Sequence, residues 1–266
     1  MIDISFENVS ETALITLWSR AVENSKTNPI IKDEKALEMM KNINYDFSKF
    51  NDAWKSQVGV CIRAKIIDDE VVAFLNRCQN CVVVNLGAGL DSRFFRVDNG
   101  AVLWYDLDLP DMIDIKKKFI KESERYKMIS KSIFDKAWMQ EIKQHNLPTL
   151  LIAEGLLMYF DKKEVYQLFN MFVEKFKQTE FIFDVIHPLL IKNSDKHDSV
   201  KNMDAKFKWG VSSKDELFLI NKRLKLKSEW SIFDYHKDRW RWVRYITVIP
   251  KIKKLLCGCV YQVRWL

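Results

Sequence analysis

Glycine is scarce in this sequence, and long uncharged segments are absent. The chain has seven glycines in 266 residues and no internal repeat or low-complexity segment. No uncharged stretch reaches about 18 residues, the length that a membrane-spanning helix needs. The first residues, "MIDISFENVSETAL", carry acids where an export signal would carry lysine or arginine. We therefore expect a soluble, cytoplasmic protein with no membrane partner.

Histidine and cysteine are also sparse, and their spacing is not that of a metal site. The four histidines are His145, His187, His197 and His236, with no H-x-x-x-H pair among them. Cys78 and Cys81 have C-x-x-C spacing, and Cys257 and Cys259 form a further pair. Two of these cysteines lie in apolar runs, whereas zinc ligands lie in tight loops. An odd total of five without an export signal favours reduced thiols, and we expect no metal.

The charge balance excludes a strongly basic binding stripe over most of the chain. The formal charge is +7, but lysines and arginines are scattered among 36 acids, except in a densely basic C-terminal fifth. We therefore expect no nucleic acid partner. With 48% hydrophobic and 13% aromatic residues, the chain can bury a large core. A single domain over residues 1–266 is expected.

The order of patterns along the chain predicts an α/β fold. Residues 1–80 have helical spacing, as in "SETALITLWSRAVENS", which places Leu14, Leu17 and Trp18 on one face. From residue 81 to 187, short β-branched or aromatic runs alternate with helical segments. These runs are at 81–86, 101–106, 126–130, 149–153 and 180–186. Alternating strands and helices predict a mostly parallel, doubly wound sheet.

The remainder of the chain departs from this alternation. Residues 188–223 are polar and rich in lysine and aspartate, and we interpret them as a cap inserted over the carboxyl edge of the sheet. Residues 224–266 contain two strand-like runs, "LKLKSEWS" and "CVYQVRWL", on either side of a helix rich in tryptophan and arginine. These runs predict two closing strands.

Two of the scarce glycines lie together in "VVVNLGAGLDSRFFR", just after the first predicted strand. The turn Gly87-Ala88-Gly89 would let a ligand approach bare backbone, and acids follow about 20 residues later, where ribose hydroxyls bind in such sheets. The third glycine of the dinucleotide pattern is replaced by Ser92, and Asp91 would repel phosphate. An adenosine ligand without pyrophosphate is favoured. The alternative is a tight turn with no ligand.

Three blocks, "NLGAGLDSRFFR", "YDLDLPDMIDIKKKFI" and "PTLLIAEGLLMYFDKKEV", resemble the leucine carboxyl methyltransferase family in order and spacing. "SETALITLWSRA", "INYDF" and "FKWGVSS" resemble its tetracenomycin-type polyketide O-methyltransferase branch. The resemblance implies S-adenosylmethionine as cofactor. It also implies the seven-stranded, Rossmann-like class I methyltransferase fold, with its last strand inserted antiparallel.

The resemblance assigns cofactor roles by position. Gly87, with Ala88 and Gly89, matches the turn around the amino-acid part of the cofactor, and we include the adjacent Asp91 in this site. Asp108 matches the acid that binds ribose, and we favour it over Asp106.

Further roles follow from the same resemblance. Arg63 matches the arginine that holds the cofactor's carboxylate, with Arg20 assisting, and Glu154 matches an acid near its ammonium group. Ser132 and Ile133 lie where the family has an aspartate and an apolar residue to recognise adenine. The serine lacks charge, so a weaker cofactor affinity is expected, or Asp135 substitutes.

Methyl transfer from a sulfonium needs alignment and exclusion of water more than acid or base catalysis. A carboxylate acceptor is already ionised near neutral pH, whereas a phenol benefits from a base. The candidate bases are His187, Asp184 and Tyr159, although a histidine before proline is often a loop residue and Tyr159 could be core. Phe207, with Trp209 and Gly210, could form an aromatic wall for a planar acceptor.

Three functions are compatible with these residues. We favour an S-adenosylmethionine-dependent O-methyltransferase acting on a hydroxyl or carboxylate oxygen of a small molecule. A protein C-terminal carboxyl methyltransferase and a non-catalytic S-adenosylmethionine-binding protein are the alternatives. The acceptor and the oligomeric state are left open by the sequence, with a homodimer as the assembly considered.

Overall fold

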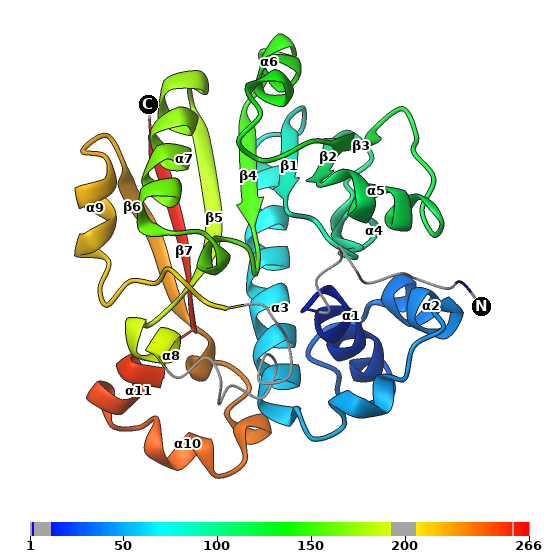
Figure 1. Cartoon of the computed structure of the whole chain (residues 1–266), viewed down its shortest axis with the longest axis vertical. Coiled ribbons are helices and arrows are strands. Elements are labelled where there is room, and N and C mark those ends of the chain that lie inside the picture. Colours follow the sequence, from blue (N-terminus) through cyan, green and yellow to red (C-terminus); the bar gives the residue numbers. More distant parts are fainter. Residues whose placement is uncertain (1, 3–11, 193–205, 257, 266) are drawn as a thin grey trace.

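The chain folds around one seven-stranded sheet with helices on both faces (Figure 1). The structure, a computed structural model, describes residue 2 and residues 12–192, 206–256 and 258–265. The strand order is β3-β2-β1-β4-β5-β7-β6. The strands are β1 (Val82–Leu86), β2 (Leu103–Asp108), β3 (Tyr126–Ser130), β4 (Thr149–Ala153), β5 (Thr179–Ile186), β6 (Lys225–Ser231) and β7 (Gly258–Trp265).

Strands β1 to β5 are parallel, and β7 lies antiparallel between β5 and β6. This confirms the predicted sheet, including its antiparallel last strand. The second strand continues two residues beyond the predicted end at Asp106. Leu107 and Asp108 pair with β3, and the Asp106 carboxylate lies inside the core, where it accepts hydrogen bonds from Trp104 Nε1 at 2.8 Å and Tyr126 Oη at 2.5 Å.

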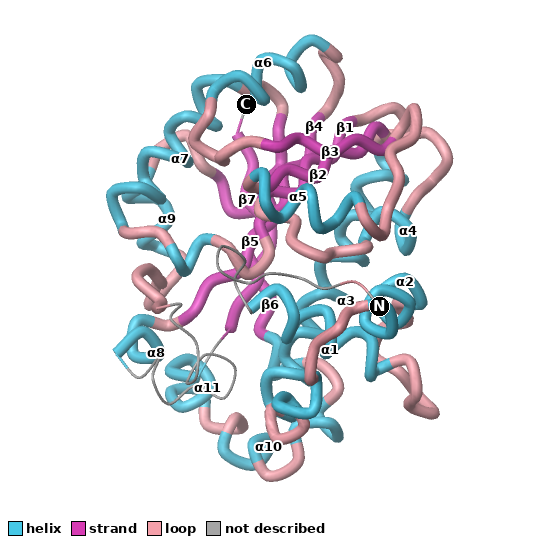
Figure 2. Tube along the Cα trace, turned by 45° about the vertical axis from the view of Figure 1, so that its right-hand side comes forward, coloured by secondary structure: helices cyan, strands magenta, loops and turns pink. Residues whose placement is uncertain are grey.

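The helices divide into groups that cover the sheet and groups that extend from its carboxyl edge (Figures 1 and 2). The first group is α3 (Trp54–Arg77), α4 (Arg93–Val97), α5 (Pro110–Lys117), α6 (Lys136–Gln144), α7 (Lys162–Lys175) and α9 (Asp215–Ile220). The second is α1 (Thr12–Glu23), α2 (Glu34–Asn42), α8 (Pro188–Lys192), α10 (Val243–Ile246) and α11 (Pro250–Leu256). Single 3₁₀ turns are η1 (Phe47–Phe50), η2 (Leu157–Tyr159), η4 (Ile232–Asp234) and η5 (Lys237–Trp240).

Both faces of the sheet are buried, which explains why its parallel strands are almost continuously apolar. Alternate residues of β1 enter different core clusters. Val83 packs with residues of the N-terminal helices, including Ile67 of α3. Val82 and Val84 pack on the opposite face with α7 residues such as Phe169. The long helix α3 therefore runs along one face of the sheet, and α7 covers the other (Figure 1).

Three cysteines of the described chain are free thiols: Cys61, Cys78 and Cys81. Burial raises the pKa of Cys61 and of Cys81 to about 12, so both are protonated near neutral pH. Cys259 is disulfide-bonded, so the expectation of reduced thiols is wrong for this residue, and Cys257 lies outside the described residues. Within the described ranges, no helix is long and apolar enough to cross a membrane, and no group of three or more acids, histidines or cysteines could hold a metal ion.

The last part of the predicted cap returns to the edge of the sheet by backbone hydrogen bonds. The backbone N–H groups of Lys208 and Trp209 donate to the Met158 carbonyl at 2.7 and 3.2 Å, and that of Val211 donates to the Ile186 carbonyl at 3.1 Å. A Cβ at Gly210 would lie well inside contact distance of the Ile186 carbonyl oxygen. Glycine is therefore needed at this position for the close approach. Residues 193–205 of the predicted cap lie outside the described residues.

A buried carboxylate joins the first helix to the closing segment. Glu23 of α1 accepts hydrogen bonds at 2.9 Å from both terminal nitrogens of Arg239 in η5, 216 residues later. It also accepts from the Ile30 N–H at 2.8 Å and from Gln57 Nε2 at 2.7 Å, and it pairs with Lys26. Burial alone would raise the pKa of Glu23, but Arg239, Lys26 and the other donors lower it to about 2.

We expect Gly210→Ala to lower the free energy of unfolding by about 3–4 kcal/mol, because the new methyl group overpacks against backbone and breaks the Val211 hydrogen bond. Urea unfolding followed by circular dichroism measures the change. Gly100→Ala is the control, because Gly100 also resists substitution, through a φ of +80°, but has no atom within 4 Å of its Cβ position. Its expected loss is only about 1 kcal/mol. Equal losses in the two variants would contradict the close approach.

The Glu23 interactions predict an acid-dependent loss of stability. The pKa of Glu23 is about 2 in the folded chain, against 4.5 for an unperturbed group. A lowered pKa stabilises the fold by about 3 kcal/mol above pH ~4.5, and this contribution disappears as the pH falls toward 2. The stability difference between wild type and Glu23→Gln should therefore shrink between pH ~5 and ~2, measured by urea unfolding. Glu38→Gln, at an exposed ion pair with Lys35, should show almost no difference at any pH. A difference for Glu23→Gln that stays constant over this range is the contradictory outcome.

Candidate active site

A cavity of about 740 Å³ opens at the carboxyl ends of the parallel strands. One end is formed by the turn after β1 and by the residues that follow β2 and β4. The other end is formed by the start of α3, the start of β7 and the segment between β6 and β7. The crevice at the carboxyl edge is where ligands bind in open parallel sheets. The cavity therefore has a polar end over the sheet and a mainly apolar end beyond it.

The turn after β1 has the backbone conformation that its glycines predict. Gly87 and Gly89 have φ values of +62° and +48°, in the left-handed region that favours glycine. A Cβ at Gly87 would lie only 2.6 Å from Leu156 Cδ1, in the turn after β4. Ala88 closes the turn by donating its N–H to the Leu107 carbonyl at 3.1 Å. All three turn residues line the cavity, so bare backbone faces it.

The two acids at the end of β2 have different environments. Asp108 lines the cavity, and each of its carboxylate oxygens accepts one backbone N–H, from Gly89 and from Leu109, both at 2.7 Å. Burial raises the pKa of Asp108, and these two hydrogen bonds offset the rise only in part. Asp106 is 2% exposed and forms an ion pair with Lys116 at 2.5 Å inside the core. Of the two acids, only Asp108 is in contact with the cavity.

A network of arginines and carboxylates lies beneath the polar end. Arg93 of α4 is completely buried and donates to Asp68 at 2.6 Å, to Asp91 at 2.5 Å and to Glu154. Arg96, one helical turn later, binds Asp68 at 2.7 Å and Asp91 at 3.3 Å. Burial alone would raise the pKa of Asp91, but these arginines hold it far below its usual range. The Asp91 carboxylate is therefore ionised.

Arg63 of α3 connects the network to the ends of β4 and β5. Its Nε donates to Glu154 at 2.9 Å, and its Nη1 donates to Asp184 at 2.8 Å. Asp184 also accepts the Gly155 N–H at 2.6 Å. Burial raises the pKa of Asp184, with the nearby Arg63 opposing the rise. Burial would raise the pKa of Glu154 as well, but Arg93 and Arg63 lower it on balance.

Arg20 of α1 completes the network on the other side of the turn. Its Nε donates to Asp33 at 3.0 Å, and its Nη2 donates to the Leu90 carbonyl at 3.0 Å. Among the described residues, the charge network consists of Asp33, Asp68, Asp91, Glu154 and Asp184 with Arg20, Arg63, Arg93 and Arg96. Five carboxylates face four guanidiniums, so its formal charge is −1. Arg93, Arg96, Asp33 and Asp68 were not predicted as site residues from the sequence, although "DSRFFR" places two arginines on one face of a helix.

The apolar end of the cavity is an aromatic chamber. Its walls are Tyr159, Leu190, Phe207, Ile232, Phe233, Trp240, Trp242, Val243, Ile246 and Leu256. The rings of Tyr159 and Phe207 lie 5.7 Å apart, and the Lys55 ammonium group lies 5.3 Å from the ring centre of Trp242. Trp209 is absent from the described walls, because its side chain is buried in the core cluster with α7. Most of the wall residues lie between positions 232 and 256. From the sequence alone, this segment was distinguished only by its content of tryptophan and arginine.

The three candidate bases differ in their relation to the cavity. Tyr159 lines it, hydrogen-bonds Thr12, and has a pKa raised mainly by burial. Asp184 lines it but is engaged by Arg63 and Gly155. His187 is not among the lining residues and accepts the Leu189 N–H at 3.2 Å, while burial and Lys254 lower its pKa.

The residues expected to recognise adenine lie apart from the cavity. Neither Ser132, which is exposed, nor Ile133, which is buried, is a lining residue. Asp135 caps α6 by accepting the Ala137 N–H at 2.8 Å and lies 3.5 Å from Lys131. Near Asp108, the cavity is bounded instead by Leu109 and Met112. The roles of Ser132 and Ile133 stay predictions.

Sequence comparison finds relatives over most of the chain. Residues 13–173 match the family model for leucine carboxyl methyltransferase. The tetracenomycin polyketide synthesis O-methyltransferase TcmP of Streptomyces glaucescens is 31% identical over 232 residues, which cover 87% of this chain and 86% of that protein. The S-adenosyl-L-methionine-dependent methyltransferase dpfgK of Gibberella zeae is 28% identical over 239 residues, 80% of this chain and 79% of that protein.

Solved structures share the fold at low identity. A DUF574 family protein from Streptomyces avermitilis superposes with a TM-score of 0.60 and 10% identity, over 97% of this chain and 98% of that chain. Magnesium protoporphyrin IX methyltransferase of Synechocystis, with bound S-adenosylhomocysteine, superposes with a TM-score of 0.50 and 10% identity, over 86% and 92%. The chain belongs to the leucine carboxyl methyltransferase family, and the expectation of an S-adenosylmethionine-dependent O-methyltransferase is confirmed.

Proposed function

We propose that this enzyme methylates an oxygen of a small, largely apolar, ring-containing molecule bound in the aromatic chamber. The observation that carries the proposal is the continuity of the cavity, which extends without interruption from the glycine turn and Asp108 to Trp240 and Trp242. A volume of about 740 Å³ is within the usual range for small-molecule sites. The polar end suits the cofactor, and the aromatic end suits the acceptor.

The polar end fits the adenosine part of S-adenosylmethionine. Each Asp108 oxygen already accepts one backbone N–H and keeps a lone pair for a ribose hydroxyl. The raised pKa of Asp108 indicates a buried carboxylate that lacks a close positive partner, and further donors would stabilise its charged form. At Gly87, a side chain would fill the space against Leu156, so glycine keeps the backbone accessible.

The charge network fits the methionine part. S-adenosylmethionine carries a sulfonium, an ammonium and a carboxylate group, so its net positive charge complements a network with one excess carboxylate. Glu154 and Asp91 line the cavity and are the acids that we assign to the ammonium end. Arg63 uses Nε and Nη1 for Glu154 and Asp184, and its Nη2 has no hydrogen bond with any described residue. This nitrogen is a donor for the cofactor's carboxylate.

The residues of the chain then act by binding, orientation and exclusion of water. The bound cofactor supplies an activated methyl group. The aromatic walls hold the acceptor's rings and keep water away from its nucleophilic oxygen. Tyr159 lies between the two ends, within the electrostatic influence of Arg63, and its hydroxyl is the group that we assign to orienting that oxygen. A carboxylate acceptor needs no base, whereas a phenol would transfer its proton to a basic group, and among the candidate bases the carboxylate that lines the cavity is Asp184.

The proposal is tested by transfer of labelled methyl from S-adenosylmethionine to aromatic hydroxy compounds, aromatic carboxylic acids and a peptide with a free C-terminus. We expect turnover with at least one aromatic class and none with the peptide. Turnover with the peptide alone would contradict the small-molecule assignment. Saturable cofactor binding without any transfer would favour the non-catalytic alternative.

The chamber wall gives a sharper test once an acceptor is found. Phe207→Ala should lower kcat/KM for an aromatic acceptor about tenfold, mainly through KM, because the wall loses ring contacts. The dissociation constant of S-adenosylmethionine, measured by calorimetry, should stay unchanged. Phe218→Ala is the matched control, since Phe218 is an exposed ring on α9 away from the chamber. A similar loss in both variants would show that the chamber is not the acceptor site.

A further inference from the structure

The net charge of the chain is concentrated at its C-terminal end. Residues 239–266 contain no aspartate or glutamate, and they contain the following basic residues: Arg239, Arg241, Arg244, Lys251, Lys253, Lys254 and Arg264. Their number equals the formal charge of the whole chain, +7, so residues 1–238 are neutral as a set. This end of the molecule is therefore its electrostatically positive part.

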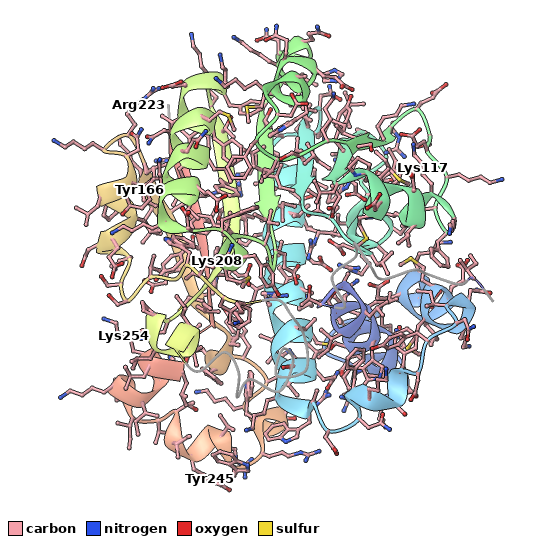
Figure 3. All side chains as sticks on the ribbon, viewed as in Figure 1. Lys117, Tyr166, Lys208, Arg223, Tyr245 and Lys254 are labelled. Atoms are coloured by element: carbon pink, nitrogen blue, oxygen red, sulfur yellow. The ribbon has the colours of Figure 1, made fainter. Side chains whose placement is uncertain are left out.

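Two of these cations are neutralised within the fold, and four on α10 and α11 or beside them are not. Arg239 pairs with Glu23, and Lys253 pairs with Asp234. The exposed side chains of Arg241, Arg244, Lys251 and Lys254 form no ion pair with any described residue. In Figure 3, Lys254 lies at the left margin of the molecule, near α8. These charges are available to an anionic partner.

The same segment exposes large apolar side chains. They are Trp242, Tyr245, Val248, Ile249 and Leu255. Val248 is 75% exposed, and Tyr245, at 64%, lies at the lower edge of the molecule in Figure 3. Helix α11 has no buried residue at all, although it carries isoleucine and leucine. An exposed apolar patch among basic residues marks an interaction surface rather than ordinary solvent-facing structure.

This surface is continuous with the aromatic chamber. Trp242, Val243, Ile246 and Leu256 line the chamber, while Tyr245, Val248 and Ile249 of the same segment face outward. The segment is thus a thin apolar wall between the cavity and the exterior.

We propose that the α10–α11 surface, formed by Arg241 to Leu256, binds the interface of an anionic lipid bilayer and takes up its apolar acceptor there. Tryptophan and tyrosine beside arginine and lysine are the combination that resides at lipid headgroups. Anionic headgroups would compensate the four unpaired cations, and the aliphatic tips would enter the acyl boundary.

A bilayer suits this surface better than an acidic protein does. Its exposed apolar side chains lie on two short helices and the turns beside them, at one end of the molecule (Figure 1), and four of the five, Tyr245, Val248, Ile249 and Leu255, do not line the cavity. The proposal departs from the sequence-based expectation of no membrane partner, which considered spanning segments, whereas interfacial binding requires none. Only the uptake of acceptor depends on the proposed function; the binding itself does not.

The test is cosedimentation of the full chain with phosphatidylglycerol–phosphatidylcholine vesicles and with pure phosphatidylcholine vesicles. We expect binding to the anionic vesicles that weakens with added salt, and little binding to the neutral ones. Two double variants, Val248→Asp with Ile249→Asp and Arg244→Glu with Lys254→Glu, should each bind the anionic vesicles at least about tenfold more weakly than wild type. None of these four residues lines the cavity, so calorimetric binding of S-adenosylmethionine should persist and report an intact fold.

Matched controls lie elsewhere on the surface. Leu219→Asp replaces a side chain that is 73% exposed on α9, and Lys117→Glu with Lys118→Glu reverses two exposed charges at α5, on the other flank in Figure 3. Both should bind vesicles like wild type.

Absence of vesicle binding, or equal weakening by the controls, would overturn the proposal. So would lost vesicle binding together with tight, salt-sensitive binding of a purified acidic carrier protein to this surface. A chain that binds vesicles but fails to bind S-adenosylmethionine would instead count against the proposed function.

Discussion

The buried Arg93 guanidinium is the interaction on which the site depends. A cation with no exposed surface is tolerated only when carboxylates surround it, and Arg93 has three of them, from α3, from the turn after β1 and from the end of β4. Each carboxylate comes from a different element, so satisfying one side chain fixes three backbones. Removing one partner from such a group typically costs about 3–5 kcal/mol. Buried charge therefore joins the segment after the glycine turn to α3 and to the end of β4.

The long helix α3 transmits this constraint to the acceptor end. Near its middle it carries Arg63 and Asp68, which belong to the charge network, and near its start it carries Lys55 and Ser56, which line the cavity. The contact of Glu23 with Arg239 fastens the closing segment to α1 at the same end. The cofactor and acceptor regions are thus positioned by the same helix, α3. In-line methyl transfer requires such alignment, because a small displacement of the acceptor oxygen lowers the rate of transfer steeply.

The sequence predicted the parts of this arrangement that depend on local pattern. Apolar runs of five to eight residues located the strands, and the scarcity of glycine drew attention to Gly87 and Gly89, whose positive φ values confirm the turn. The chamber could not be predicted in this way, because Phe233, Trp240 and Trp242 converge through short turns with no regular spacing. The charge network was missed for a similar reason. Asp33 and Arg96 are 63 residues apart and meet only after folding. Asp106 is the opposite case. Its distance in sequence from Gly87 matches that of a ribose-binding acid, but its carboxylate is buried among Trp104, Lys116 and Tyr126.

The central claim is that the glycine turn, Asp108 and the charge network form the cofactor site, and that the aromatic chamber is reserved for the acceptor. A crystal structure of the enzyme with S-adenosylhomocysteine tests it most directly. The account predicts ribose hydroxyls within hydrogen-bonding distance of Asp108, the amino-acid part beside Gly87 and Arg63, and a chamber free of cofactor. A cofactor bound between Trp240 and Phe207, with Asp108 making only its two backbone hydrogen bonds, would contradict it.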